Sequence, residues 1–310
     1  MADVTAPPGA LRRFVDSDVF YSFRRSKVTV AAAIVTAIVV FASLLGPWIA
    51  PHDTYDVRSL NLLDAFTPPV WSEGGNPAYL LGTDDQGRDV FSTILLGARV
   101  SLLVGFAATL FAMTLGVLLG LISGYVGGTT DAVIMRIADI KLSFPAILIA
   151  LLIDGVARGI IPRDMHDDLA LYVVIFAIGI SNWVAYARTV RGSTLVEKNK
   201  EYVQAARIIG LHPFTIMIRH VLPNVLGPVL VIATLGLAGA ILAEATLSFL
   251  GVGVPPTRPS LGTLIRVGNN FLFSGEWWMT IFPGVMLVIL VLAVNLLGDW
   301  LRDALNPKLR

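Results

Sequence analysis

Residues 100–123 read VSLLVGFAATLFAMTLGVLLGLIS, and no side chain in this stretch is charged. A helix of about 20 apolar residues can cross the hydrocarbon core of a bilayer, because it satisfies its own backbone hydrogen bonds. The stretch therefore predicts a membrane-spanning helix.

Five further segments are long and apolar enough to span a bilayer. With the first, they occupy residues 28–50, 100–123, 132–153, 169–187, 221–243 and 279–298. Only 132–153 contains charged residues, namely Arg136, Asp139 and Lys141, and Pro145 should kink that helix because proline interrupts the hydrogen-bond ladder. We expect an all-α integral membrane protein with six transmembrane helices.

The composition of the 310-residue chain agrees with a membrane protein. Charged residues make up 15% of it, against about 25% in soluble domains, and the mean hydropathy is +0.74. No dense basic stripe predicts nucleic-acid binding, and no cysteine is present to form a disulfide or a thiolate site. The four histidines, His52, His166, His212 and His220, lack the spacing of a helical metal pair, so we expect neither a metal site nor catalysis.

The basic residues predict the orientation. If the N-terminus is cytoplasmic, the inner segments carry twice as many Lys and Arg residues as the outer ones. This is the positive-inside pattern, so both termini should be cytoplasmic. The predicted parts are a cytoplasmic N-terminal segment 1–27, a first transmembrane helix 28–50, an extracytoplasmic segment 51–99 and a five-helix core 100–310.

The cytoplasmic stretch 195–220 reads as two short helices. Its first helix has an apolar stripe of Tyr202, Ala205, Ala206 and Ile209. Gly210 fits a left-handed helix C-cap, and Pro213 fits the first turn of the next helix. The pattern leaves two possibilities open: the pair lies on its own bundle or on the lipid interface, or it inserts into a groove of a soluble partner.

The same stretch carries a motif. Gln204-Ala205-Ala206, then Gly210 after three residues and His220-Val221-Leu222-Pro223 after nine more, resembles the E-A-A-x3-G-x9-I-x-L-P loop of ABC importer permeases. Gln204 stands where that motif has Glu, and His220 where it has Ile. The resemblance implies an ATPase-coupling loop at 195–220, with the following candidate residues: Tyr202, Gln204, Ala205, Ala206, Gly210, His220, Leu222 and Pro223.

Stretches on both sides of the loop indicate which subfamily of permeases the chain resembles. LGTDDQGRD at 81–89, LSFLG at 247–251 and NLLGD at 295–299 are similar to the second (C-type) permease subunit of dipeptide and oligopeptide importers. Importers of nickel and other small solutes share this pattern and remain an alternative. An ion-coupled secondary transporter is a further one, although such carriers usually show repeat symmetry, which this sequence lacks.

The resemblance implies a pore subunit in the bacterial cytoplasmic membrane. Its expected partners are the lipid bilayer, a second permease subunit, two ATPase subunits and an extracytoplasmic substrate-binding protein. The chain has no phosphate-binding loop of the form G-x-x-x-x-G-K-[ST], so ATP and Mg should belong to the ATPase subunits, and no cofactor is expected here.

Small residues predict close helix packing in two spans. Gly116, Gly120 and Gly124 fall on one face of the second span, where they allow close packing either within the subunit, which we favour, or against a partner subunit. The fifth span carries Gly227, Gly236, Gly239 and Ala240, and it follows the predicted coupling loop directly. We expect this span to line the translocation path.

Charged residues at the span ends have simpler interpretations. Arg136 and Asp139 can form an ion pair three residues apart, and Glu244 and Asp299 are expected at the membrane interface. Asp84, Asp85, Arg88 and Asp89 form a cluster outside the second span. We interpret this cluster as a solvated, self-paired surface, with a contact to the binding protein or a peptide terminus as the alternative.

Overall fold

The computed structural model describes residues 18–54 and 60–304. Expectations for 1–17, 55–59 and 305–310 lie outside the described residues. The α-helices are α2 (Asp18–Arg25), α3 (Lys27–Leu44), α4 (Gly46–Ile49), α5 (Val90–Val126), α6 (Gly128–Leu142), α7 (Ala146–Ile160), α8 (His166–Glu197), α9 (Glu201–Ile208), α10 (Pro213–Ile216), α11 (Leu222–Phe249), α12 (Leu261–Asn269) and α13 (Trp278–Ala304). Short helical turns are η2 (Leu62–Asp64), η3 (Arg163–Met165), η4 (Met217–Val221) and η5 (Leu272–Ser274).

The predicted helical membrane fold is confirmed, with one change in the third span. Five segments within the described chain are long and apolar enough to cross a membrane, or up to six if one bent pair counts as a span. That pair is α6 and α7, which meet at 92°. The predicted interruption at Pro145 is confirmed, but it is a full break and not a kink: α6 ends at Leu142, Pro145 is the N-cap residue of α7, and the two helices take separate directions.

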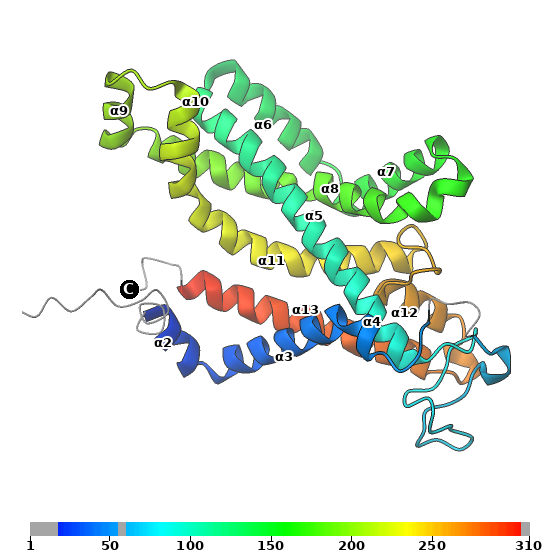
Figure 1. Cartoon of the computed structure of the whole chain (residues 1–310). Helices are drawn as coiled ribbons and strands as arrows, with labels where there is room; N and C mark the ends of the chain where they lie inside the picture. The colour runs from blue at the N-terminus through cyan, green and yellow to red at the C-terminus, as the bar shows by residue number, and fades with distance from the viewer. Residues whose placement is uncertain (1–17, 55–59, 305–310) are drawn as a thin grey trace, which may run out of the picture.

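Helix α5 connects two groups of helices. It runs diagonally across the molecule, with its first half beside α3, α12 and α13 and its second half beside α6 and α8 (Figure 1). Helix α5 begins at Val90, because the Asp89 carboxylate caps it by accepting from the Ser92 backbone N–H at 3.0 Å. Residues 90–99, which we assigned to the extracytoplasmic segment, are therefore the first turns of this helix.

Glycines bring α5 and α8 into close contact, as the sequence predicted. A Cβ added at Gly116 would lie 2.5 Å from the Trp183 carbonyl oxygen, and one at Gly124 would lie 2.7 Å from the Thr194 Cβ. Gly120 faces Val190 in the same way. The three notches therefore serve packing inside this subunit.

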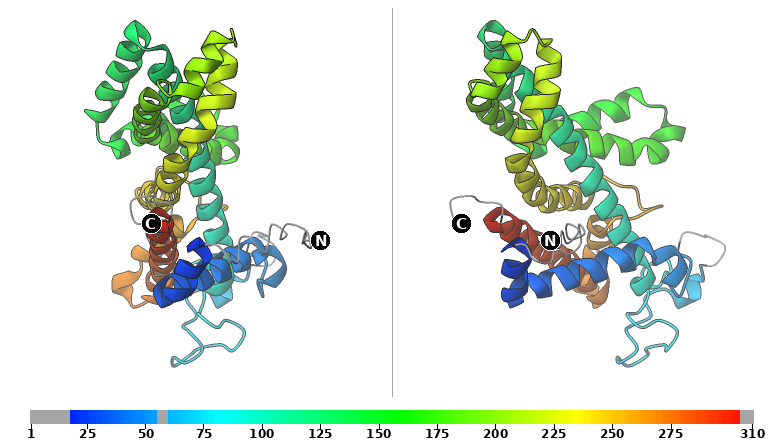
Figure 2. Two further views of the ribbon diagram at one scale, coloured as in Figure 1. Left: turned by 90° about the vertical axis from the view of Figure 1, so that its left-hand side faces the viewer. Right: turned by 60° about the vertical axis from the view of Figure 1, so that its left-hand side comes forward.

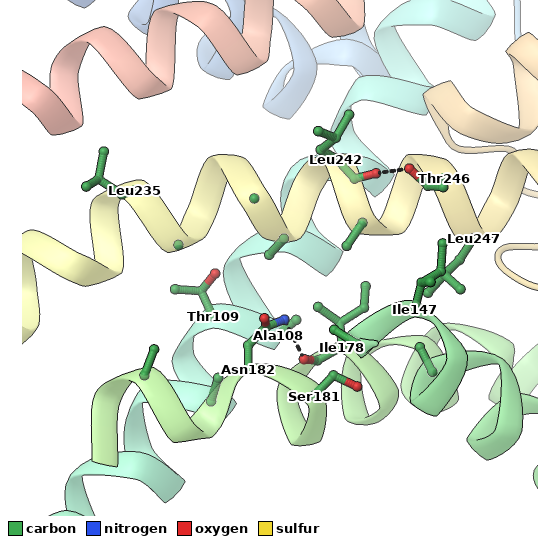
Figure 3. Close-up of a pocket in the computed structure, with 18 of the residues that line it drawn as sticks. Ala108, Thr109, Ile147, Ile178, Ser181, Asn182, Leu235, Leu242, Thr246 and Leu247 are labelled. Carbon is green, nitrogen blue, oxygen red and sulfur yellow. Dashed lines mark hydrogen bonds between the residues drawn. The ribbon is translucent and has the colours of Figure 1, made fainter. Parts of the chain in front are cut away.

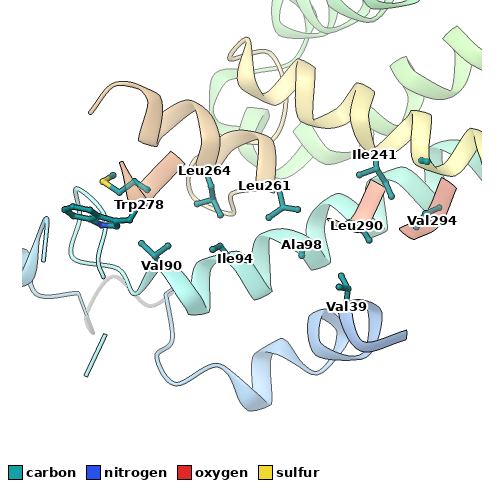
Figure 4. Close-up of a cluster of buried hydrophobic side chains, with 12 residues drawn as sticks. Val39, Val90, Ile94, Ala98, Ile241, Leu261, Leu264, Trp278, Leu290 and Val294 are labelled. Carbon is teal, nitrogen blue, oxygen red and sulfur yellow. The ribbon is translucent and has the colours of Figure 1, made fainter. Parts of the chain in front are cut away.

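A hydrophobic core holds the other group together. Val39 of α3, Ile94 and Ala98 of α5, Ile241 of α11 and Leu290 of α13 are buried in one cluster (Figure 4). Large apolar side chains on the opposite faces of the same helices remain exposed, as expected of helices that contact lipid.

Helix α9, helix α2 and the C-terminal end of α13 lie on the left-hand side of Figure 1, with α9 at the top and the other two below, and Figure 2 shows the same vertical separation. The rings of Phe23 in α2 and Trp300 in α13 lie 5.1 Å apart, edge to face. The side of the membrane on which the chain ends and the loop 195–220 lie stays a prediction.

Candidate functional site

The segment between α8 and α11 is fastened to both helices. The Tyr202 hydroxyl donates to the Glu197 carboxylate at the end of α8, and Lys200 lies 2.8 Å from the same carboxylate. On the other side, the Asn224 side-chain amide donates to the Tyr202 oxygen at 3.1 Å and to the His220 carbonyl at 2.7 Å. Tyr202 therefore links the end of α8 to the start of α11.

The environment of Tyr202 favours its neutral form. Burial, and then the hydrogen bond to the Glu197 carboxylate, raise the pKa of Tyr202 to about 12. The phenol hence keeps its proton, and donates it to Glu197, throughout the physiological pH range.

Gly210 ends α9 as predicted. The φ of Gly210 is +84°. The Gly210 N–H donates to the Arg207 carbonyl at 3.0 Å, and the Leu211 N–H donates to the Ala206 carbonyl at 3.1 Å. A Cβ at this position would meet nothing within 4 Å. Glycine is therefore needed for the backbone conformation and not for space.

The apolar face of α9 differs from the predicted one. Val203 and Ala206 are buried against α5 and α11, whereas Tyr202, Ala205 and Ile209 of the predicted stripe are exposed. The stripe was misplaced because it omitted Val203, whose β-branched side chain faces the bundle.

Large apolar side chains point away from the bundle around Gly210. Ile208 is 87% exposed, Ile209 is 76% exposed and Phe214 is 62% exposed. We call these three residues the distal patch. Such a patch on the non-core side of a helix pair is typical of a surface that binds another protein or a membrane.

The remaining predicted loop residues lie on α9, in η4 and in the first turn of α11. Gln204 and Ala205 are exposed on α9, and the Gln204 side chain donates to the Asn199 carbonyl at 3.0 Å. Pro223 is exposed in the first turn of α11, while His220 and Leu222 are half-buried. The Tyr202 hydrogen bonds therefore bring the start of α9 next to His220 and the start of α11, whereas Gly210 follows the other end of α9.

An apolar cavity of about 540 Å³ lies between α5, α7, α8 and α11 (Figure 3). Its polar lining residues are Thr109, Ser181, Asn182, Tyr186 and Thr246, and no lining residue is charged. The Ser181, Asn182 and Thr246 side chains donate to carbonyls of their own helices at 2.7–2.9 Å.

Helix α11 contributes small residues to this cavity. Gly236, Gly239 and Ala240 line it, and the Tyr186 hydroxyl occupies the space where a side chain at Gly236 would begin. The fifth predicted span therefore lines the cavity, and its role as a translocation path stays a prediction.

Glu244 is not at the interface, contrary to our prediction. It is completely buried, and its two carboxylate oxygens accept from Ser101 of α5 and Ser248 of α11, each at 2.7 Å. The Ser101 oxygen accepts from the Leu261 backbone N–H at 3.2 Å, and that of Ser248 from Val254 at 3.1 Å. Glu244 therefore connects α5, α11, the 250–260 loop and α12. The Glu-x3-Ser spacing within one helical turn could have indicated this.

The charged cluster outside α5 is self-paired but largely buried, so the solvated surface that we predicted is wrong. Arg88 forms an ion pair with Asp84 at 2.6 Å, and both side chains are more than nine-tenths buried. Arg88 also donates to the Pro256 carbonyl at 3.3 Å. Burial, and then the neighbouring Asp84 carboxylate, raise the pKa of Asp85. The cluster therefore fixes the segment before α5 against the 250–260 loop.

The charges of α6 pair with α8. Asp139 lies 2.6 Å from Arg188, so the predicted Arg136–Asp139 pair is wrong. Asp131 accepts two hydrogen bonds from Arg191 at 2.5 and 2.6 Å. These pairs fix α6 to α8.

Within the described part of the chain, no three His, Cys, Asp or Glu side chains form a group that could hold a metal ion.

Comparison with known proteins gives two family matches. Residues 116–310 match the model of the binding-protein-dependent transport system inner membrane component, and residues 17–69 match the N-terminal TM domain of oligopeptide transport permease C.

Similar proteins extend over almost the whole chain. The dipeptide transport system permease protein DppC of Haemophilus influenzae is 40% identical, covering 98% of this chain and 97% of its own. That of Escherichia coli strain K12 is 41% identical, covering 94% and 92%. The oligopeptide transport system permease protein OppC of Bacillus subtilis is 36% identical, covering 94% and 90%.

A solved structure shares the fold. A chain of the inward-facing MetNI methionine ABC transporter superposes with a TM-score of 0.54 at 21% identity, covering 70% of this chain and 97% of its own.

Proposed function

Because the chain belongs to the family of binding-protein-dependent transport system inner membrane components, we propose that it is a permease subunit of an ATP-driven importer of dipeptides or oligopeptides. The peptide substrate class is supported by the dipeptide and oligopeptide permeases that align with nearly its full length. In this proposal the pore is formed with a second permease, and a binding protein delivers the substrate on the extracytoplasmic side.

The observation that carries the proposal is the link between the distal patch and the cavity. Ile208, Ile209 and Phe214 are presented by a helix pair that continues through η4 into α11. Helix α11 then lines the cavity with Gly236 and Gly239. A partner that moves the patch would therefore move a wall of the cavity.

Two cytoplasmic ATPase subunits fit this role, one of them at this chain's distal patch. ATP binding that closes the ATPase dimer would shift the permease between inward-open and outward-open states, provided that the closed dimer prefers one state. ATP and Mg would be held by the ATPases, and this chain would supply no catalytic group.

The predicted coupling residues have separate tasks in this scheme. Tyr202 and Asn224 keep the patch at a fixed position relative to α8 and α11. Gly210 sets the angle between α9 and α10. Gln204 and Ala205 lie exposed on α9, where they can contact the partner.

The first test is purification of the tagged chain from its native membrane, with the mass of the intact complex and identification of its subunits. One copy together with a second permease and two ATPase chains is expected. Recovery alone or as a homodimer would refute the importer assignment.

The docking surface has its own matched test. Phe214→Asp should reduce copurification of the ATPase at least about tenfold, because it places a charge in an apolar contact. Phe273, which is 99% exposed in η5, gives the control Phe273→Asp, which should have no effect. Equal ATPase recovery from both variants would exclude the distal patch as the docking surface.

A further inference from the structure

A second, charged pocket lies beyond the apolar cavity. It has a volume of about 240 Å³ and is bounded by α7, the start of α8, the 250–256 loop and α12. Its charged and titratable lining residues are Asp154, Arg158, His166, Asp167 and Arg266. We call it the charged pocket.

The two cavities follow one another along the same helices. On α7, Ala150 lines the apolar cavity and Asp154, one turn later, lines the charged pocket. Leu247 in the last turn of α11 lines the first, and Gly251, just after this helix, lines the second. A solute that occupies the charged pocket is therefore next to the apolar cavity.

Most polar groups of the charged pocket already have partners. Asp154, which is buried, pairs with Arg158 at 2.5 Å, and Asp167 accepts from Thr257 at 3.3 Å. The His166 Nε2 lies 2.7 Å from the Ile161 carbonyl oxygen and so serves as its donor.

Arg266 differs from these groups. Among the described residues its guanidinium makes no hydrogen bond or ion pair, and its Nε is buried without a partner. A buried N–H without an acceptor is costly, and a guanidinium presents Nε and Nη as a planar fork that matches a carboxylate. The guanidinium lies against Gly251, where an added Cβ would be 2.8 Å from Nη1.

The surroundings favour a carboxylate that belongs to a peptide. Val173, Val254 and Pro255 give the pocket apolar walls for a side chain, and Asp167 provides an acceptor for an amide or amine. The volume suits a terminal residue and not a whole oligopeptide.

We propose that the charged pocket of this chain binds the C-terminal residue of a peptide, with Arg266 receiving its carboxylate, before the peptide enters the apolar cavity. This inference rests on the proposed function. The alternative is a purely structural role for Arg266, because a cation beside Gly251 complements the C-terminal dipole of α11.

The absence of cysteine from the chain allows a direct test. Ala157 lines the pocket and is half-buried, so Ala157→Cys provides a single reporter thiol. Its rate of modification by an anionic methanethiosulfonate is measured on this chain in the full complex, with Ala-Ala, C-terminally amidated Ala-Ala or acetate present.

Ala-Ala should slow the modification at concentrations about tenfold or more below those at which its amide does, as expected for one charge-assisted contact. Arg266→Gln should abolish the difference between the two peptides, and Arg266→Lys should restore part of it. The control is Arg258→Gln, which removes an exposed charge from the same loop outside the pocket and should leave the difference unchanged.

Three results would overturn the proposal. Equal protection by both peptides would exclude carboxylate recognition, and unchanged selectivity in Arg266→Gln would leave Arg266 with the dipole role. Protection by acetate as strong as by Ala-Ala would show a general anion site without peptide recognition.

Uptake of labelled Ala-Ala by the same complex in proteoliposomes distinguishes a failure of the charged-pocket inference from a failure of the proposed function. Uptake without selective protection refutes the charged-pocket inference alone. Absence of peptide uptake, with the binding protein present, refutes the proposed function.

Discussion

Replacing Gly210 by valine should uncouple ATP hydrolysis from transport without preventing assembly. The φ of Gly210 is +84°, in the region that is costly for residues with a Cβ and most costly for β-branched ones. Since a Cβ would meet no atom within 4 Å, the whole cost arises in the backbone.

The size of the effect follows from that backbone cost. A strained left-handed residue costs about 2 kcal/mol, which lowers the population of the observed α9–α10 geometry about thirtyfold. Transport should fall by a similar factor if it requires this geometry. Insertion should be unaffected, because the long apolar helices α5, α8, α11 and α13 do not depend on the turn.

The assay is uptake of labelled dipeptide and substrate-stimulated ATP turnover in proteoliposomes, normalised to the amount of assembled complex. Gly210→Asn should retain activity within a few-fold of the unmodified protein, because asparagine tolerates the left-handed region. Gly192→Val is the matched control: Gly192 lies inside α8, also with no atom within 4 Å of an added Cβ.

The variants Gly210→Val, Gly210→Asn and Gly192→Val together distinguish backbone strain at the turn from the effect of added side-chain bulk. Normal uptake by Gly210→Val, at normal subunit content, would refute the requirement for a left-handed residue. An equal loss in Gly192→Val would show that added bulk in this region, and not the backbone conformation, is responsible.

Three further predictions concern packing, buried polar groups and pH. Gly120→Leu should prevent assembly of the subunit, measured as loss of monodisperse protein in size-exclusion chromatography, because its side chain would collide with α8 near Val190. Glu244→Leu should lower the free energy of unfolding by about 2 kcal/mol or more, since it removes the acceptors of two buried hydroxyls, and Glu244→Gln should cost less; thermal unfolding in detergent measures both. The pKa of Tyr202 is raised to about 12, so the stability that its protonated hydroxyl contributes should be complete below pH 10 and decrease between pH 10 and 12. The pKa is measured as the difference between the phenolate absorbance titrations of the protein and of Tyr202→Phe.

The sequence was most informative where one local property determines the structure. Runs of about 20 uncharged residues predicted the membrane helices, because a helix of that length crosses the bilayer and satisfies its own backbone hydrogen bonds. Gly210 was predictable as a C-cap because few other residues adopt its φ. Pro145 indicated the break between α6 and α7, but the 92° angle depends on what each helix packs against.

Features that depend on distant partners were not predictable in the same way. Asp139 pairs with Arg188 and not with Arg136, and a local spacing rule cannot anticipate a neighbour on another helix. Glu244 was misplaced because its partners Ser101 and Leu261 come from separate parts of the chain. No sequence pattern pointed to Arg266, because its Nε lacks a hydrogen-bond partner inside a pocket that is formed by four separate chain segments.

Helix α11 gives these separate sites one mechanical connection. It begins after the π-helical turn Met217–Val221, beside the distal patch, and its middle lines the apolar cavity. Its end carries Glu244 and Ser248, whose hydrogen bonds hold the 250–260 loop and, through Ser101, the start of α12. A displacement at the patch that travels along α11 therefore passes a point where this helix is anchored to α5 by a buried carboxylate. Weakening that anchor by Glu244→Gln should consequently reduce the coupling between movements of the two ends of α11. Substitution of Gly210 instead changes the α9–α10 turn, on the patch side of both cavities.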